Sequence, residues 1–133
     1  MGTARKTVVI FDADHEHRSG LAGTLRKHNY EVLTPDTSDE IIQNASRGKI
    51  DLVLTDHSRP AGIDGIELTR KIKSSRKEVK VIFFSECLDL DMYIREMNSG
   101  AEDCLEKPCR HDDILRVIES SFRRKADANG REN

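Results

Sequence analysis

Short apolar runs alternate along the chain with segments whose apolar residues recur every three or four positions. The runs predict strands at residues 7–11, 30–33, 51–55, 79–84 and 102–105. The segments between them predict helices at about 16–28, 38–47, 65–74 and 90–97, and a last helix that carries Ile114, Leu115, Ile118 and Phe122. From Arg123 onward the chain is polar, which predicts a disordered tail.

The alternation of five strands with five helices predicts an α/β fold with a doubly wound parallel sheet. Three of the strands are continuously apolar, as expected when helices cover both faces of a sheet. The length of 133 residues suits one domain with its own core, which we place at residues 1–125. Residues 126–133 are then a polar tail or the start of a linker.

Polar side chains follow four of the predicted strands, where ligands of such sheets bind. These residues are Asp12, Asp56, Ser85 and Lys107. Two neighbouring carboxylates repel each other and need a cation, and an oxygen-only site favours Mg²⁺. A lysine and a hydroxyl can hold an anion beside that ion. The set therefore predicts phosphoryl chemistry, in which a carboxylate can itself accept the phosphoryl group.

The composition gives little reason to expect nucleic acid or membrane as a partner. The net charge is −2 and the sequence pI is about 6.2. No apolar run approaches the roughly 20 residues of a membrane helix, and the first residues lack a signal peptide's apolar segment. The three cysteines are odd in number and form no C-x-x-C pair, which favours reduced thiols and a cytoplasmic location.

The motifs around these residues resemble those of response regulator receiver domains. The similar pieces are VVIFDADHEHR, DLVLTDHSRP with IDGIEL, VIFFS and GAEDCLEKP, and the resemblance covers about residues 6–122. It implies a CheY-like, flavodoxin-like sheet of strand order 2-1-3-4-5. It also implies two-component signalling, with a sensor histidine kinase or phosphotransfer protein as donor. A downstream protein or a fused effector domain would be the output.

The resemblance also implies a role for each residue. Asp56 would accept the phosphoryl group, and Ser85 and Lys107 would contact its oxygens. Asp12, Asp56 and the backbone carbonyl of Ser58 would hold Mg²⁺. Such a domain is no classical enzyme, although its aspartyl phosphate could hydrolyse slowly.

Several positions depart from the family pattern. Ala13 stands where the family has its direct metal ligand, and Asp14 or Glu16 are the candidates to replace it. Asp14 is equally suited to cap the following helix. Glu86 stands where a small residue normally admits phosphate, and Cys104 replaces an aromatic residue. The loop from Asp56 to Asp64-Gly65 is one residue longer than usual.

These departures keep two alternatives open. The first is a pseudo-receiver, a docking module of the same fold that works without phosphorylation. The second is a haloacid-dehalogenase-type phosphatase with Asp12 as nucleophile, which would use Ser85, Lys107 and Asp112-Asp113 but leaves Asp56 without a role. His15, His17 and His57 could form a transition-metal site, but we interpret them as exposed loop residues.

Overall fold

The computed structural model describes residues 5–57, 63–86 and 89–131, with side chains described to residue 124. Within this part of the chain, the elements alternate strictly between strand and helix. Their order is β1 (Thr7–Phe11), α1 (His15–Lys27), β2 (Glu31–Leu33), α2 (Ser38–Ser46), β3 (Leu52–Asp56), α3 (Gly65–Ser75), β4 (Lys80–Ser85), α4 (Leu90–Asn98), β5 (Asp103–Glu106) and α5 (His111–Arg131). The elements agree with those predicted from the sequence to within a few residues at their ends.

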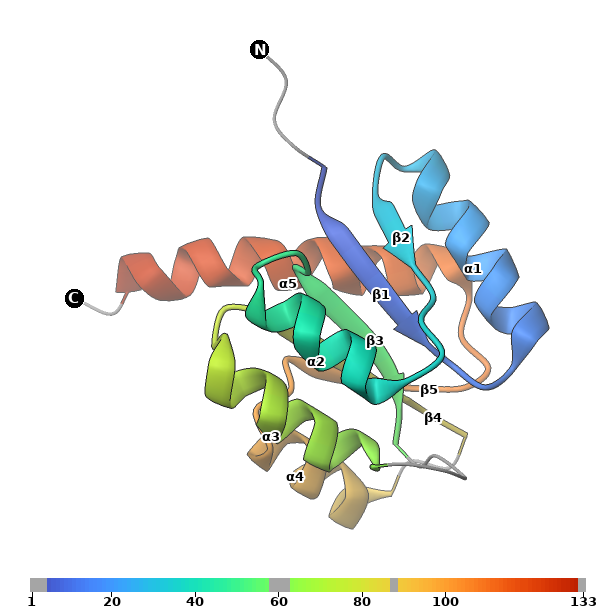
Figure 1. Ribbon diagram of the computed structural model, residues 1–133. Helices are drawn as coiled ribbons and strands as arrows, with labels where there is room; N and C mark the ends of the chain where they lie inside the picture. Colours follow the sequence, from blue (N-terminus) through green and yellow to red (C-terminus); the bar gives the residue numbers. More distant parts are fainter. Residues whose placement is uncertain (1–4, 58–62, 87–88, 132–133) are drawn as a thin grey trace.

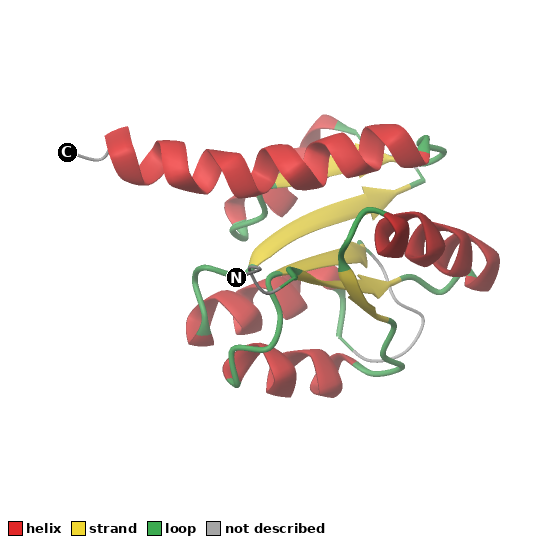
Figure 2. Ribbon diagram, turned by 90° about the horizontal axis from the view of Figure 1, so that it is seen from above, coloured by secondary structure: helices red, strands yellow, loops and turns green. Residues whose placement is uncertain are grey.

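The strands form one parallel sheet of order β2-β1-β3-β4-β5, which confirms the predicted fold class. Helices cover both faces (Figures 1 and 2). Alternate residues of β1 show the division: Val8 and Ile10 pack with α1 and α5, whereas Val9 and Phe11 pack with α2 and α3. The two apolar layers fix the strands so that their carboxyl ends lie along one edge.

The register of the sheet brings the predicted site residues to that edge. Phe11 pairs with Thr55, so Asp12 and Asp56 each follow at the end of neighbouring strands. Asp56 in turn pairs with Phe84, which places Ser85 one step beyond on β4. Gly65 allows the chain to return closely past this edge, because a Cβ there would lie 2.5 Å from the Asp56 carbonyl oxygen.

Helix α4 is attached to the sheet differently from its neighbours. Its apolar residues Leu90, Tyr93 and Ile94 are 73%, 40% and 47% exposed. The buried residue of this helix is an acid, Glu96, whose exposure is 0%. A charged side chain therefore takes the place that a leucine or isoleucine has in the other helices.

The end of the chain differs from the sequence prediction. The tail expected to be disordered from Arg123 continues α5 to Arg131, and the helix projects past the sheet in Figure 1. Alanine, arginine and lysine in this segment are good helix formers, so a polar stretch of this composition is compatible with a helix. The boundary predicted near residue 125 stays a prediction.

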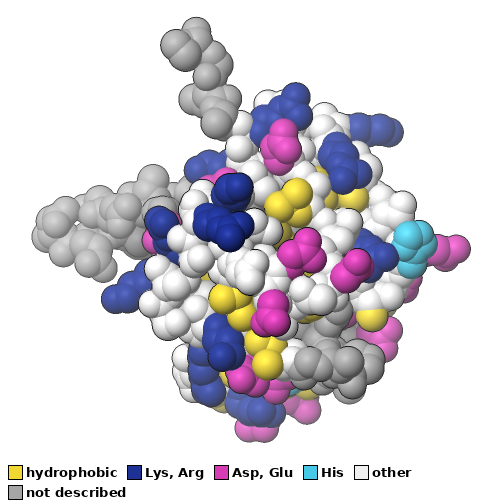
Figure 3. Space-filling model, viewed as in Figure 1, with side chains coloured by type: hydrophobic (Ala, Val, Ile, Leu, Met, Phe, Trp, Pro, Cys, Tyr) yellow, Lys and Arg dark blue, Asp and Glu magenta, His cyan; other side chains and the backbone are white. Residues whose placement is uncertain are grey.

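Acidic and basic side chains are interspersed over the face drawn in Figure 3, in keeping with the small net charge. Among the described residues, no helix combines the length and apolar character needed to cross a bilayer.

Candidate functional site

Asp12 lies at the end of β1 and is buried, with 4% of its surface exposed. Its carboxylate accepts hydrogen bonds from the Asp14 amide at 2.9 Å and from Lys107 Nζ at 3.2 and 3.1 Å. His17 Nδ1 lies 2.6 Å from Asp12 Oδ2. Each contact compensates part of the cost of burying a charge.

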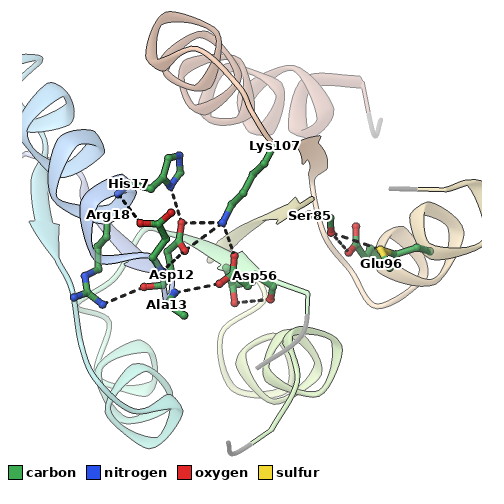
Figure 4. A network of polar contacts seen from close by, with 11 residues as sticks. Asp12, Ala13, His17, Arg18, Asp56, Ser85, Glu96 and Lys107 are labelled. Carbon is green, nitrogen blue, oxygen red and sulfur yellow. Dashed lines mark hydrogen bonds and ion pairs between the residues drawn. The ribbon is translucent and has the colours of Figure 1, made fainter. Parts of the chain in front are cut away.

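Asp56 lies beside Asp12 at the end of β3 (Figure 4). Its Oδ1 accepts from Lys107 Nζ at 3.0 Å, and its Oδ2 accepts from the Ala13 amide at 3.2 Å. Lys107, which follows β5, thus bridges the two carboxylates with one ammonium group. The three side chains form a compact cluster of alternating charge.

Hydrogen bonding sets the ionisation of this cluster. Burial alone would raise the pKa of Asp12, but the hydrogen bonds from the Asp14 amide, His17 and Lys107 outweigh burial and hold that pKa below its usual value. Burial would lower the pKa of Lys107, but its bonds to Asp56 and Asp12 raise it. Asp12 is therefore a carboxylate and Lys107 an ammonium at neutral pH.

The donor atoms suit a hard divalent ion only in part. Mg²⁺ commonly binds through one or two carboxylates together with phosphate oxygens and water, and Asp12 and Asp56 supply two carboxylates. Asp14 caps α1 by accepting from the His17 amide, and Glu16 is exposed in the first turn of that helix. Ser58 lies outside the described residues. Within the described ranges, no three His, Cys, Asp or Glu side chains form a group that could hold a metal.

The interpretation of two histidines as exposed loop residues is wrong. The His17 side chain is 20% exposed and pairs with Asp12, and its ring stands edge-on to Phe84 at 5.6 Å. The His57 side chain is 12% exposed and pairs with an acid of α4. A histidine near a buried carboxylate contacts it as a hydrogen-bond donor. His17 lies five residues from its partner Asp12, whereas His57 and its partner are 39 residues apart, so local sequence does not indicate the second pair.

Ser85 points away from the charged cluster and toward α4. Its hydroxyl Oγ lies 3.4 Å from Glu96 Oε2 and 3.5 Å from Met92 Sδ. In Figure 4 this contact lies apart from the group formed by Asp12, Asp56 and Lys107. The structure thus places all four predicted strand-end residues at one edge, but it divides them into two groups.

Sequence reasoning missed Glu96 and misread His57. The carboxylate of Glu96 accepts from His57 Nδ1 at 2.7 Å and is fully buried. The one signal in the sequence is an acid at the spacing of a helix's buried stripe, four residues after Met92. A charged residue at such a position is normally read as solvent-exposed.

The remaining departures from the family pattern also lie at this edge. Glu86 is exposed beside Lys107 and Cys109, with which it lines a hollow of about 410 Å³. Cys104 is half-buried on β5, and burial together with a hydrogen bond to Glu96 raises the pKa of its thiol. Burial and the nearby Asp113 also raise the pKa of Cys109, so neither thiol is an activated nucleophile.

The family model of the response regulator receiver domain matches residues 8–119. The two-component response regulator ARR6 of Arabidopsis thaliana is 32% identical over 126 residues, which cover 85% of this chain and 67% of that protein. The transcriptional regulatory protein FixJ of Bradyrhizobium diazoefficiens is 26% identical over 91% of this chain. The chain spans 58% of the length of FixJ.

Solved structures agree with these sequence matches. The CheY-like receiver domain protein of Methanospirillum hungatei superposes with a TM-score of 0.81 at 26% identity, over 97% of this chain and 99% of that one. The chemotaxis protein CheY4 of Vibrio cholerae, at 21% identity, gives a TM-score of 0.80 over 89% and 99% of the two chains and shares the fold. The phosphatase alternative loses its basis, because sequence and fold together show that the chain belongs to the response regulator receiver domain family.

Proposed function

We propose that this domain accepts a phosphoryl group on Asp56 and thereby switches a protein-interaction surface in two-component signalling. The observation that carries the proposal is the bridge from Lys107 to both Asp12 and Asp56. It holds the Asp56 carboxylate at the edge of the sheet and leaves an ammonium group beside it. An ammonium at this place can pair with the charge that a phosphoryl group brings.

The proposed transfer is a substitution at phosphorus. An oxygen of Asp56 attacks the phosphorus of a phosphohistidine in a sensor kinase or a phosphotransfer protein. The phosphorus–nitrogen bond breaks, the imidazole leaves with its electron pair, and an acyl phosphate remains. Lys107 keeps part of its contact with the Asp12 carboxylate and contacts the new phosphoryl oxygens. Receiver domains are generally not classical enzymes, and slow hydrolysis of this acyl phosphate would reset the domain.

Asp12 and Asp56 are the residues that would hold Mg²⁺, with phosphoryl oxygens and water as its other ligands. Such an ion would neutralise charge between the carboxylates and the incoming phosphoryl group. Lys107 would then have to give up part of its contact with Asp12 and Asp56. Competition of this kind, together with the alanine at position 13, predicts weak binding of the ion.

The direct test is to incubate the protein with Mg²⁺ and a small phosphodonor, then to measure the intact mass and locate the phosphate. We expect one added phosphoryl group on Asp56, none after chelation of the metal, and none in Asp56→Asn. Asp36→Asn is the matched control, because Asp36 is an exposed acid in the loop after β2. Phosphate that persists in Asp56→Asn would contradict the proposal.

The second candidate is a docking module that works without phosphorylation. Its specific support is that Lys107 already bridges Asp12 and Asp56 and that His17 also contacts Asp12, while Glu86 adds a negative charge at the entrance. This candidate predicts no Mg²⁺ binding at millimolar concentration in a calorimetric titration. It also predicts that a partner binds wild type and Asp56→Asn equally. The partner protein, the effector and a cytoplasmic location stay predictions in either case.

A further inference from the structure

The contacts of Glu96 join α4 to the ends of β3 and β4. Its Oε2 accepts from His57 Nδ1 at 2.7 Å and lies 3.4 Å from Ser85 Oγ. His57 follows Asp56 directly after β3, and Ser85 ends β4. Glu96 also helps to raise the pKa of the Cys104 thiol on β5, after burial. One buried carboxylate is therefore shared by the residue that follows β3 and by the last residue of β4.

This arrangement is costly as a purely structural device. Glu96 has 0% exposure, and its second oxygen, Oε1, is buried without a hydrogen-bond partner in the described part of the chain. Burying a carboxylate is unfavourable unless its hydrogen bonds are satisfied, and an apolar side chain of similar volume commonly does as well or better. In helix α4 the apolar residues Leu90, Tyr93 and Ile94 are exposed. A buried apolar side chain at position 96 would therefore stabilise the packing of α4 on the sheet more than it would that of the other helices.

The hydroxyl of Ser85 has a single proton and donates to one acceptor at a time. While it donates toward Glu96 or Met92, it cannot donate to a phosphoryl oxygen on Asp56. A phosphoryl group on Asp56 therefore competes with α4 for this proton. When Ser85 turns away, Glu96 loses a donor in a buried position, which disfavours the present place of α4.

We infer that Glu96 is a positioning residue that holds Ser85 toward α4 in the unphosphorylated domain and must release it when Asp56 is phosphorylated. The inference rests on the proposed function, and it names the contact through which the site and α4 are coupled. Two states of α4, with and without the Ser85 contact, then have different affinities for the phosphoryl group. The exposed apolar side chains of α4 change position when the helix passes from one state to the other.

A double-mutant cycle tests the inference. We expect Glu96→Ala to raise the initial rate of Asp56 phosphorylation by a small phosphodonor about three- to tenfold, which is the net contribution of one typical hydrogen bond. In a Ser85→Ala background, the same substitution is expected to leave the rate unchanged. Asp91→Ala is the matched control, since Asp91 is an exposed acid of the same helix.

If circular dichroism shows that Glu96→Ala does not fold, Glu96→Gln replaces it in the experiment. The glutamine has nearly the same volume and a weaker acceptor, so the rate is expected to rise about two- to threefold. A spectroscopic readout on wild type needs no variant of Glu96. The carboxyl carbon resonance of Glu96 is expected to shift on phosphorylation, and this shift is expected to shrink in Ser85→Ala.

The outcomes separate the two proposals. If no variant takes up phosphate, the proposed function fails and the role of Glu96 fails with it. If wild type takes up phosphate and both Glu96 variants do so at the same rate, with an unmoved Glu96 resonance, the role of Glu96 alone is overturned. An equal rate increase with and without Ser85 also overturns it, because Glu96 would then act through general destabilisation.

Discussion

The edge of the sheet has two halves that are built differently. On the acceptor half, Lys107 bridges the carboxylates of Asp12 and Asp56 through two ion pairs, next to an open hollow. On the switch half, Ser85 and Glu96 lie in the interior, where the acid keeps an oxygen without a partner among the described residues. The acceptor half keeps Asp12, Asp56 and Lys107 but has Ala13 in place of the family's direct metal ligand. The switch half keeps Ser85 but has Cys104 in place of the family's aromatic residue.

The difference suggests that the acceptor half carries out phosphoryl transfer and that the switch half converts it into a change of packing. Transfer of a phosphoryl group depends on positioned charges, and an altered charge at that place would abolish the reaction. The readout depends on which of two packed arrangements is more stable, and several sets of side chains can provide such a pair. The acceptor half should therefore tolerate substitution poorly, and the switch half should respond by shifts in rate.

The largest effect is expected from Lys107→Met. Without the ammonium group, neither Asp12 nor the phosphoryl group has its partner cation. Loss of one such electrostatic contact typically lowers a rate about hundredfold, and we expect this for phosphorylation of Asp56. Lys71→Met is the control, since Lys71 is exposed on α3. A rate within a factor of two of wild type would show that the bridge has no part in the transfer.

A smaller gain is expected from restoring an acid at position 13. Ala13 is exposed at the mouth of the site, and its amide already contacts Asp56. An additional carboxylate raises the ligand charge available to Mg²⁺, so Ala13→Asp is expected to tighten binding about tenfold in a calorimetric titration. Ala13→Asn offers an uncharged oxygen and should tighten it less. Equal affinities in all three proteins would place the ion elsewhere.

The sequence predicted the acceptor half better than the switch half, for a physical reason. Asp12, Asp56 and Lys107 each stand just beyond a strand, and parallel strands end at one edge, so local pattern alone brings these residues together. Glu96 and His57 meet across a wide separation in sequence, through the packing of α4 on the sheet. No local pattern encodes that contact, and a buried acid runs against the usual preference.

The same principle explains the tail and the first loop. Residues 123–131 are polar, and this composition predicted a disordered tail, but a polar helix can have the same composition. The sequence allowed two interpretations of Asp14, as a metal ligand or as a helix cap, and the structure shows it as the cap of α1. Apolar periodicity predicts the layers of the fold, but the donors that a carboxylate contacts depend on how separate segments pack together.

The alkylation rate of the Cys104 thiol reports on the environment of Glu96 in the switch half. Burial and the bond to Glu96 raise its pKa, so the thiol is expected to alkylate slowly at pH 8.5. Glu96→Gln removes the neighbouring charge and should speed labelling by up to about tenfold, which corresponds to one pKa unit. Peptide mass spectrometry separates Cys104 from Cys109, whose labelling is expected to stay constant because its pKa is raised by burial and by Asp113, not by Glu96.

The pH dependence has a definite sign. Because the folded thiol has a raised pKa, its contribution to stability is complete below the ordinary value of 9.0 and is lost as the pH rises above it. The unfolded chain then releases the proton more readily than the folded one. Urea unfolding of wild type and Cys104→Ser should diverge above pH 9, with wild type losing more stability. Parallel curves would show that folding does not raise the pKa of this thiol.

The smallest effect is expected at the entrance of the acceptor half. Glu86 is exposed and lines the hollow with Lys107, so its charge opposes an incoming anion through solvent. Glu86→Gln is expected to raise the rate with a small anionic phosphodonor about two- to fivefold at low ionic strength, and the gain should fade with added salt. If Glu86 instead obstructs the entrance by its size, Glu86→Gln is expected to leave the rate unchanged, because the two side chains have nearly the same volume, and Glu86→Ala is expected to raise it. Repulsion by charge predicts equal rates for Glu86→Ala and Glu86→Gln. In that case phosphorylation is limited at the acceptor half by access of the anionic donor, and at the switch half by release of Ser85.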